Sequence, residues 1–150
     1  MKLLIPPPIQ FLVCGGGAWL LARALPALDF SASVLLGAGW SLIAAGAAIL
    51  VVSVLMFFKA KTTVNPHAPD RTKTLVRHGL YRFSRNPMYL AMALLLIGGA
   101  ALLQNGAAFA GPVMFVLAVT YLQIMPEEKA LREKFGDDYA DYCRRTRRWI

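Results

Sequence analysis

Charged residues are scarce in this sequence. Asp, Glu, Lys and Arg make up 16% of the 150 residues, and 57% are hydrophobic, whereas soluble domains average about 25% charged. The shortage is local as well as general, because residues 33–58 and 88–125 contain no charged side chain at all. Runs of this kind leave too little polar surface for a soluble domain of this size, which argues against that class.

Cysteine is equally sparse, and several familiar catalytic patterns are missing. Cys14 lies inside an apolar run and Cys143 near the C-terminus, so we expect no disulfide framework and two reduced thiols. No His and Cys residues are grouped with metal-ligand spacing. The glycines at 15–17 are not followed by the Lys-Ser/Thr of a phosphate loop, and no serine lies in a nucleophile elbow. Close packing of helices through small residues is the better interpretation of this glycine run.

What the sequence does contain is a set of four long apolar runs. Each is about long enough to cross a bilayer once at ~1.5 Å per residue. They cover approximately residues 9–25, 33–58, 88–103 and 107–125. The first run follows three prolines and lacks a clear small-x-small cleavage site, so we interpret it as a retained helix rather than a signal peptide. We therefore predict a single-domain, all-α integral membrane protein over residues 1–150, with four transmembrane helices and short cytoplasmic C-terminal helices.

Positive charge is sorted to one side of these predicted spans. Of the 16 Lys and Arg residues, seven lie in the 59–87 segment and seven in the 126–150 tail, while Arg23 alone falls on the opposite side. The positive-inside rule then places both termini and both polar segments in the cytoplasm. We expect the membrane to be a bacterial inner membrane. The net charge of +8 predicts attraction to anionic lipid headgroups. A basic tail would also suit nucleic acid, but not in a four-span protein, so we expect no nucleic-acid partner.

Two polar motifs flank the third and fourth apolar runs. The first occupies residues 78–89 and the second residues 126–131, with a Gln-Asn-Gly turn at 104–106 between the runs. Two crossings return the chain to the side that it left. We therefore expect both motifs at one membrane face, where together they could form an active site.

The first motif ends where the loop becomes the third predicted helix. Pro87 suits a first helical turn, with Asn86 as its cap and Arg85 as an interfacial residue. A functional interpretation adds Tyr81 and Tyr89 as aromatic walls for a flat heterocycle, although Tyr is common at membrane interfaces anyway.

The second motif supplies two adjacent carboxylates, Glu127 and Glu128. On a helix they point about 100° apart, so one can face the bundle while the other faces water. A carboxylate facing the bundle near Arg85 or His78 could accept hydrogen bonds from a ribose, an amine or a cationic cofactor; a solvated carboxylate is the alternative. His78 itself is either a proton carrier or a structural residue. The basic residues of the 144–150 tail, with Trp149, predict an interfacial anchor rather than part of a site.

Taken together, the 78–89 motif, Glu127-Glu128-x-x-Leu131 and the residues at 135–142 resemble the isoprenylcysteine carboxyl methyltransferase family. That family belongs with the phospholipid methyltransferases among membrane-embedded enzymes that use S-adenosylmethionine. The resemblance covers approximately residues 60–150. It implies S-adenosylmethionine as cofactor, bound without a Rossmann fold between the last membrane helices and the C-terminal helices.

The resemblance also assigns roles to particular residues. Glu127 matches the carboxylate that holds the cofactor. Separately from the resemblance, we expect Arg85 or Glu128 to orient or deprotonate the nucleophile. The complete set of cofactor contacts that the resemblance implies is Lys73, Thr74, Leu75, Val76, His78, Gly79, Tyr81, Asn86, Pro87, Met88, Tyr89 and Glu127.

The sequence departs from the family pattern at Gln123. Family members that methylate a prenylated cysteine carboxylate commonly have an Arg at this position, four residues before the Glu that matches Glu127. An Arg can pair with a carboxylate through a bidentate contact, and a Gln cannot supply that charge. We therefore assign Gln123 to the substrate side. Three kinds of lipophilic or lipidated acceptor stay open, namely a carboxylate, a phospholipid or other amine, and a thiol. A non-catalytic lipid-binding membrane protein is the alternative function.

Overall fold

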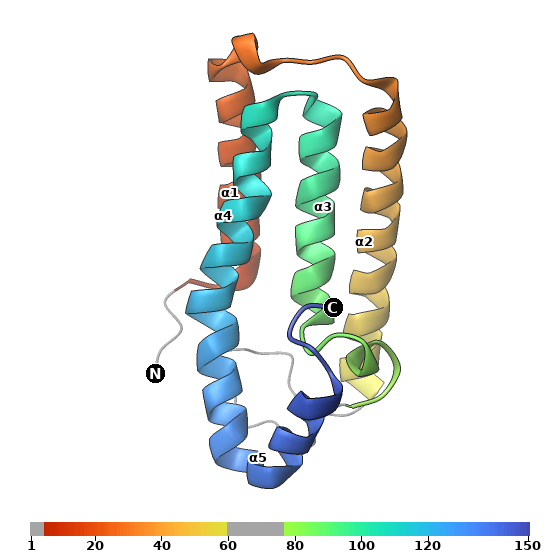
Figure 1. Ribbon diagram of the computed structural model, residues 1–150, viewed down its shortest axis with the longest axis vertical. Helices are drawn as coiled ribbons and strands as arrows, with labels where there is room; N and C mark the ends of the chain where they lie inside the picture. Colours follow the sequence, from red (N-terminus) through yellow and green to blue (C-terminus); the bar gives the residue numbers. More distant parts are fainter. Residues whose placement is uncertain (1–4, 60–76) are drawn as a thin grey trace.

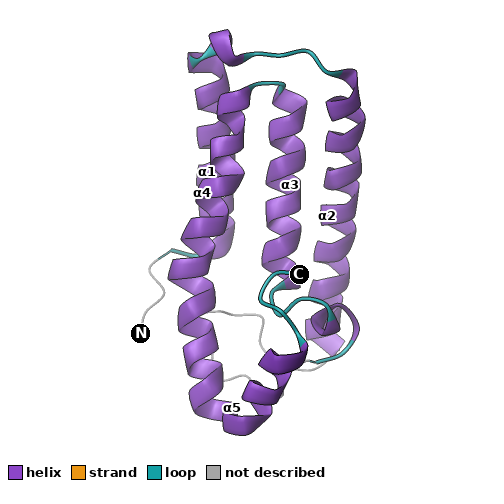
Figure 2. Ribbon diagram, viewed as in Figure 1, coloured by secondary structure: helices purple, strands orange, loops and turns teal. Residues whose placement is uncertain are grey.

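The computed structural model describes residues 5–59 and 77–150, and Lys73, Thr74, Leu75 and Val76 therefore lie outside the described residues. The described part is all-helical, as predicted (Figure 2). Its main elements are α1 (Pro7–Ala24), α2 (Ser33–Lys59), α3 (Pro87–Leu103), α4 (Ala110–Val119), the π-helical η5 (Thr120–Ile124) and α5 (Met125–Arg145). Short 3₁₀ turns η1 (Pro26–Leu28), η3 (Gly79–Arg82) and η4 (Gly106–Phe109) connect them.

The four apolar helices α1 to α4 run along the long axis of the molecule (Figure 1). α2 packs against α3, and α1 packs against α4. Two helices in the described residues are long and apolar enough to cross a membrane, Ser33–Met56 and the continuous helical path Gly106–Arg145. α3 is apolar but has 17 residues, slightly short of the ~20 that a bilayer needs. Four transmembrane helices therefore stay a prediction.

Three glycines explain how closely α2 and α3 approach each other. A Cβ atom added to Gly98 would lie 2.7 Å from the carbonyl oxygen of Gly39, and one added to Gly46 would lie 2.9 Å from that of Ala91. Neither space admits a side chain. The glycine run at 15–17 differs, because only at its first residue does an added Cβ meet another atom within 4 Å. The predicted close packing through this run is therefore wrong for its second and third residues.

The turn between α3 and α4 lies where it was predicted. Gln104 adopts a left-handed conformation (φ 48°), which ends α3. Asn105 is fully buried, and its Nδ2 donates to the carbonyl of Leu25 (2.9 Å) and to Oδ1 of Asp29 (2.6 Å). These bonds attach the α3–α4 turn to the connection between α1 and α2.

α4, η5 and α5 form one continuous helical path, and Pro126 is the second residue of α5. Proline lacks an amide hydrogen and its ring clashes with the carbonyl four residues earlier, here that of Leu122. The wider π-helical turn of η5 contains that residue and is the kind of adjustment that accommodates such a conflict. The polar helix α5 therefore continues directly from the apolar helix α4.

Gly136 divides α5 into two parts. Its φ of 49° and ψ of −123° are non-helical, and glycine adopts such angles without steric cost. The second part, residues 137–145, turns back towards the beginning of α3 (Figure 1). The hydroxyl of Tyr142 donates to the carbonyl oxygen of Tyr81 (2.6 Å) and holds it there.

Candidate functional site

The two polar motifs meet through Tyr89 and Glu127. The Tyr89 hydroxyl donates to Oε1 of Glu127 at 2.8 Å, across 38 residues of sequence. Tyr89 lies in the first turn of α3 and Glu127 in the first turn of α5. The hairpin of α3 and α4 thus brings the motifs together as the sequence predicted.

Glu127 lies just beyond the apolar 107–125 run, and its environment changes its acidity. Burial raises the pKa of the Glu127 carboxyl from 4.5 to about 7; the hydrogen bond from Tyr89 opposes this rise, and the neighbouring Glu128 adds to it. Burial raises a carboxyl pKa because it disfavours the charged form. Glu127 therefore gains or loses a proton near neutral pH, and a bound cation would favour the ionised form.

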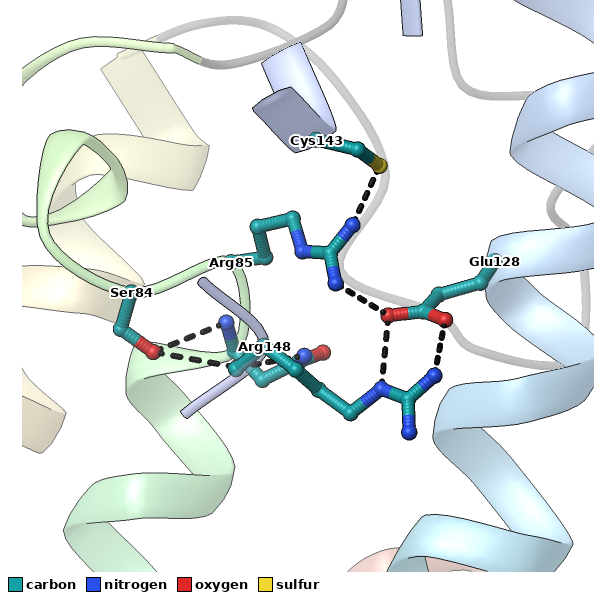
Figure 3. Close-up of polar contacts among 6 residues, drawn as sticks. Ser84, Arg85, Glu128, Cys143 and Arg148 are labelled. Atoms are coloured by element: carbon teal, nitrogen blue, oxygen red, sulfur yellow. Dashed lines mark hydrogen bonds and ion pairs between the residues drawn. The ribbon is translucent and has the colours of Figure 1, made fainter. Parts of the chain in front are cut away.

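Glu128 forms a separate, buried ion-pair cluster (Figure 3). Only 8% of the residue is exposed. Arg85 Nη2 lies 3.1 Å from its Oε1, while Arg148 donates from Nε to Oε1 (3.0 Å) and from Nη2 to Oε2 (2.7 Å). Because both oxygens already bind guanidinium groups, this geometry favours Glu128 as a residue that orients its neighbours rather than one that accepts a proton from a nucleophile.

Arg85 is bound from several directions at the beginning of α3. Its Nη1 donates to Sγ of Cys143, and its amide nitrogen donates to the carbonyl of Arg147 (3.0 Å). The first of these contacts joins it to the second part of α5 (Figure 3). Arg85 therefore connects α3, both parts of α5 and the tail.

The C-terminal tail takes part in this cluster, which sequence reasoning missed. Arg148 binds Glu128, and its carbonyl accepts a hydrogen bond from Nδ2 of Asn86 (3.0 Å). Trp149 packs against the apolar cluster that includes Phe115 and Ile124. The prediction of an interfacial anchor did not include these contacts of residues 148 and 149, and the anchor itself stays a prediction. Four arginines within five residues gave no signal of which one would turn inward.

Other predicted site residues differ in their surroundings. Pro87 is the first residue of α3, as expected, whereas the Asn86 side chain makes no capping bond because it donates to the Arg148 carbonyl instead. Met88 is half-buried beside them. His78 is exposed, and its carbonyl accepts from Tyr81 N (3.2 Å).

Gly79 and Tyr81 shape the short η3 turn before α3. Gly79 has a φ of 59°, and a Cβ there would collide with the Met56 side chain. Tyr81 is buried, and burial raises the pKa of its hydroxyl far above the usual value, with Tyr142 and Glu127 contributing. The hydroxyl of Tyr81 is therefore neutral at physiological pH and suits a wall of the site rather than a base.

Gln123 is completely buried in η5, one turn before Glu127. Its Nε2 donates to the carbonyl of Ile5 at 2.5 Å. A second buried amide, Gln10 of α1, donates to the same carbonyl at 2.8 Å. Sequence reasoning did not select Gln10, because a single polar residue near the start of an apolar run carries no spacing signal.

No group of three or more His, Cys, Asp and Glu side chains that could hold a metal ion occurs among residues 5–59 and 77–150. The clusters around Glu127 and Glu128 therefore combine carboxylates with tyrosine and arginine side chains. Such a combination suits binding of a cationic organic group at Glu127, next to a fixed structural ion pair at Glu128.

Comparison with known proteins decides the family. A family model described as phospholipid methyltransferase matches residues 34–138, from α2 into the second part of α5. This chain belongs to the phospholipid methyltransferase family. The match includes Tyr89, Gln123 and Glu127 and ends before Arg148. An uncharacterized protein of Haemophilus influenzae (strain ATCC 51907 / DSM 11121 / KW20 / Rd) is 40% identical over 63 residues, which are 42% of this chain and the whole of that protein. No solved structure matches this member of the phospholipid methyltransferase family.

Proposed function

We propose that this protein is an integral membrane methyltransferase that uses S-adenosylmethionine and acts on a lipophilic acceptor. The observation that carries the proposal is the contact of Tyr89 with Glu127 inside the region matched by the phospholipid methyltransferase family. It joins the two polar motifs, residues 78–89 and 126–131, at the first turns of α3 and α5. The family match alone would not show that the two motifs are in contact.

The residues at this contact fit the cofactor. S-adenosylmethionine has a sulfonium and an ammonium group, and Glu127 offers a carboxylate whose burial strengthens its attraction to a positive charge. Tyr81 and Tyr89 offer aromatic surface for the adenine ring. We assign His78, Gly79, Asn86, Pro87 and Met88, which lie at the same end of the bundle, as further cofactor contacts. The family resemblance adds Lys73, Thr74, Leu75 and Val76, which lie outside the described residues.

Each residue then has a defined task. When bound, S-adenosylmethionine supplies an electrophilic methyl group on a positively charged sulfur. Glu127 holds the cationic part of the cofactor, and Tyr89 fixes the orientation of that carboxylate. Arg85, Glu128 and Arg148 hold the first turns of α3 and α5 at a constant separation. Alignment of nucleophile and methyl group, with exclusion of water, is the main contribution that a protein makes to such a displacement.

The placement of the site also suits a lipophilic acceptor. Apolar side chains such as Val34, Trp40 and Leu12 are largely exposed on α1 and α2, as lipid-facing residues are in a membrane protein. We propose that all four apolar helices span a bacterial inner membrane, with both termini and the site in the cytoplasm. The acceptor would enter between helices from the bilayer, and the cofactor from the cytoplasm. Because Gln123 carries no positive charge, it does not favour a carboxylate over the other acceptor classes.

Calorimetric titration of the detergent-purified chain with S-adenosylmethionine tests the proposal. We expect saturable binding, with loss of at least tenfold in affinity for Glu127→Gln and a smaller loss for Tyr89→Phe, because removal of a charged hydrogen-bond partner costs about 1.5–3 kcal/mol. Glu133→Gln is the matched control, since Glu133 is an exposed acid on the same helix. Its affinity should equal that of the wild type.

The same titration separates the proposed enzyme from a non-catalytic lipid-binding protein. Absence of binding at near-millimolar cofactor would contradict the proposal and favour the second function. Where binding is seen, incubation of membranes with cofactor labelled in its methyl group, followed by analysis of the lipid phase, identifies the acceptor.

A further inference from the structure

Two buried amide side chains from distant parts of the chain meet at one backbone carbonyl. Gln10 of α1 is 4% exposed and Gln123 of η5 is 0% exposed. Their Nε2 atoms donate to the Ile5 carbonyl oxygen at 2.8 Å and 2.5 Å respectively. Both amides are therefore fixed by the same acceptor, at the edge of the apolar bundle.

This shared acceptor determines which way each amide faces. A carbonyl oxygen only accepts hydrogen bonds, so each Gln must direct its NH₂ group to Ile5 and its Oε1 elsewhere. Both Oε1 atoms are buried and have no hydrogen-bond partner within residues 5–59 and 77–150. A buried oxygen without a partner costs about 1–3 kcal/mol, and native proteins seldom leave two such atoms together.

The position of the pair relates it to the proposed cofactor carboxylate. Gln123 precedes Glu127 by four residues on one helical path, which corresponds to a rise of about 6 Å. Gln123 lies on the apolar side of Glu127, within the 107–125 run. Of the two amides, Gln123 is therefore one helical turn from Glu127, and Gln10 is joined to it through the Ile5 carbonyl.

We propose that Gln10 and Gln123 form a specificity pair that accepts hydrogen bonds from the polar group of the methyl acceptor. This inference rests on the proposed function, because that function identifies the ligand as a methyl acceptor. Two unpartnered oxygens require two donors. A primary amine has at least two N–H donors, a thiol or hydroxyl has one, and an ionised carboxylate has none. The pair therefore selects an amine among the three acceptor classes that the sequence leaves open.

Three amphiphiles of equal chain length provide the test, namely decylamine, trimethyldecylammonium and decanoate. Trimethyldecylammonium keeps the positive charge of the amine but has no N–H donor. Native mass spectrometry of the full chain, released from detergent, measures the occupancy of each across a concentration series. We expect about tenfold tighter binding of decylamine than of trimethyldecylammonium, as two net hydrogen bonds provide, and decanoate should bind no better than the latter.

Matched variants assign this preference to the pair. The double substitution Gln10→Met with Gln123→Met should reduce the preference to about onefold, and each single substitution should reduce it by about threefold. Gln104→Met is the control, because Gln104 lies at the α3–α4 turn and donates to the Ala32 carbonyl. It should keep the full preference. If the double variant does not fold, the two single variants decide the question.

Two results would overturn the proposal. One is equal binding of both cations by the wild type, as expected if buried water alone satisfies the amides. The other is an unchanged preference in the Met variants. Calorimetry with S-adenosylmethionine keeps this inference distinct from the proposed function, because the Met variants should retain cofactor affinity within about twofold of the wild type. A wild type that does not bind the cofactor would contradict the proposed function and leave the amine preference to be judged by its own measurement.

Discussion

The Arg148 guanidinium binds both carboxylate oxygens of Glu128, through Nε at 3.0 Å and Nη2 at 2.7 Å. This bidentate contact joins the C-terminal tail to the first turn of α5. It also joins a residue inside the family match to one that lies outside it. A charge-assisted bidentate pair has fixed geometry as well as strength, so the tail is attached to the site at a defined position.

Arg148→Met should destabilise the protein by about 2 kcal/mol. The substitution leaves the buried Glu128 with Arg85 as its remaining cationic partner, so the loss is smaller than for a carboxylate left entirely unpaired. Denaturant unfolding in detergent micelles measures the difference. Arg147→Met is the matched control, because that side chain is exposed and its carbonyl contact with Arg85 involves only the backbone. Equal stability of the two variants would contradict a structural role for the Arg148 pair.

Cofactor affinity should depend on pH through Glu127. The folded pKa of this carboxyl, about 7, lies above its ordinary value of 4.5, so the unliganded protein loses stability as pH rises between these values. A cationic ligand binds the ionised form. Affinity for S-adenosylmethionine should therefore increase about fifteenfold from pH 5.5 to pH 7.0, as the ionised fraction does. Calorimetry at the two pH values checks this, and Glu127→Gln should give a flat profile. A wild-type affinity that does not change with pH would show that Glu127 does not titrate on binding.

The sequence allowed correct prediction of those features that depend on local pattern. Apolar runs located the helices, Pro87 was expected in the first turn of α3, and the 104–106 turn lies between α3 and α4 as predicted. The contact of Tyr89 with Glu127 was within reach too, because two crossings of comparable length return the chain to one end. In each case the information lies in spacing along the chain, or in a residue type with a narrow conformational preference.

Contacts formed by the return of the tail could not be predicted in this way. The pairing of Arg148 with Glu128 depends on the backbone angles at Gly136 and on how far the second part of α5 turns. The Asn86 side chain was expected to cap α3, but its Nδ2 donates to the carbonyl oxygen of Arg148 instead. Gln10 and Gln123 meet because α1 packs beside the α4–η5–α5 path, and neither residue carries a periodic signal. Long-range pairs of single polar residues have no counterpart in sequence spacing.

Two adjacent glycines of α3 should respond oppositely to the same substitution. Gly98→Ala places a Cβ 2.7 Å from the Gly39 carbonyl oxygen and 2.8 Å from Ile43 Cγ1, whereas no atom lies within 4 Å of a Cβ added at Gly99. We expect Gly98→Ala to destabilise the fold by about 1–3 kcal/mol through overpacking. Gly99→Ala should be neutral or stabilising by up to about 1 kcal/mol. Unfolding in detergent measures both, and equal effects would contradict the close approach of α2 and α3.

Gly136→Ala tests whether backbone conformation directs the tail to the site. A Cβ at Gly136 meets no atom within 4 Å, so the cost arises from the φ of 49° alone and should be about 1–3 kcal/mol. If the substitution redirects the second part of α5, Arg148 also loses its contact with Glu128. The double variant Gly136→Ala with Arg148→Met should then be less destabilised than the sum of the two single variants. Additive losses would mean that the tail reaches Glu128 whatever the conformation at residue 136, and that the glycine only ends a helix.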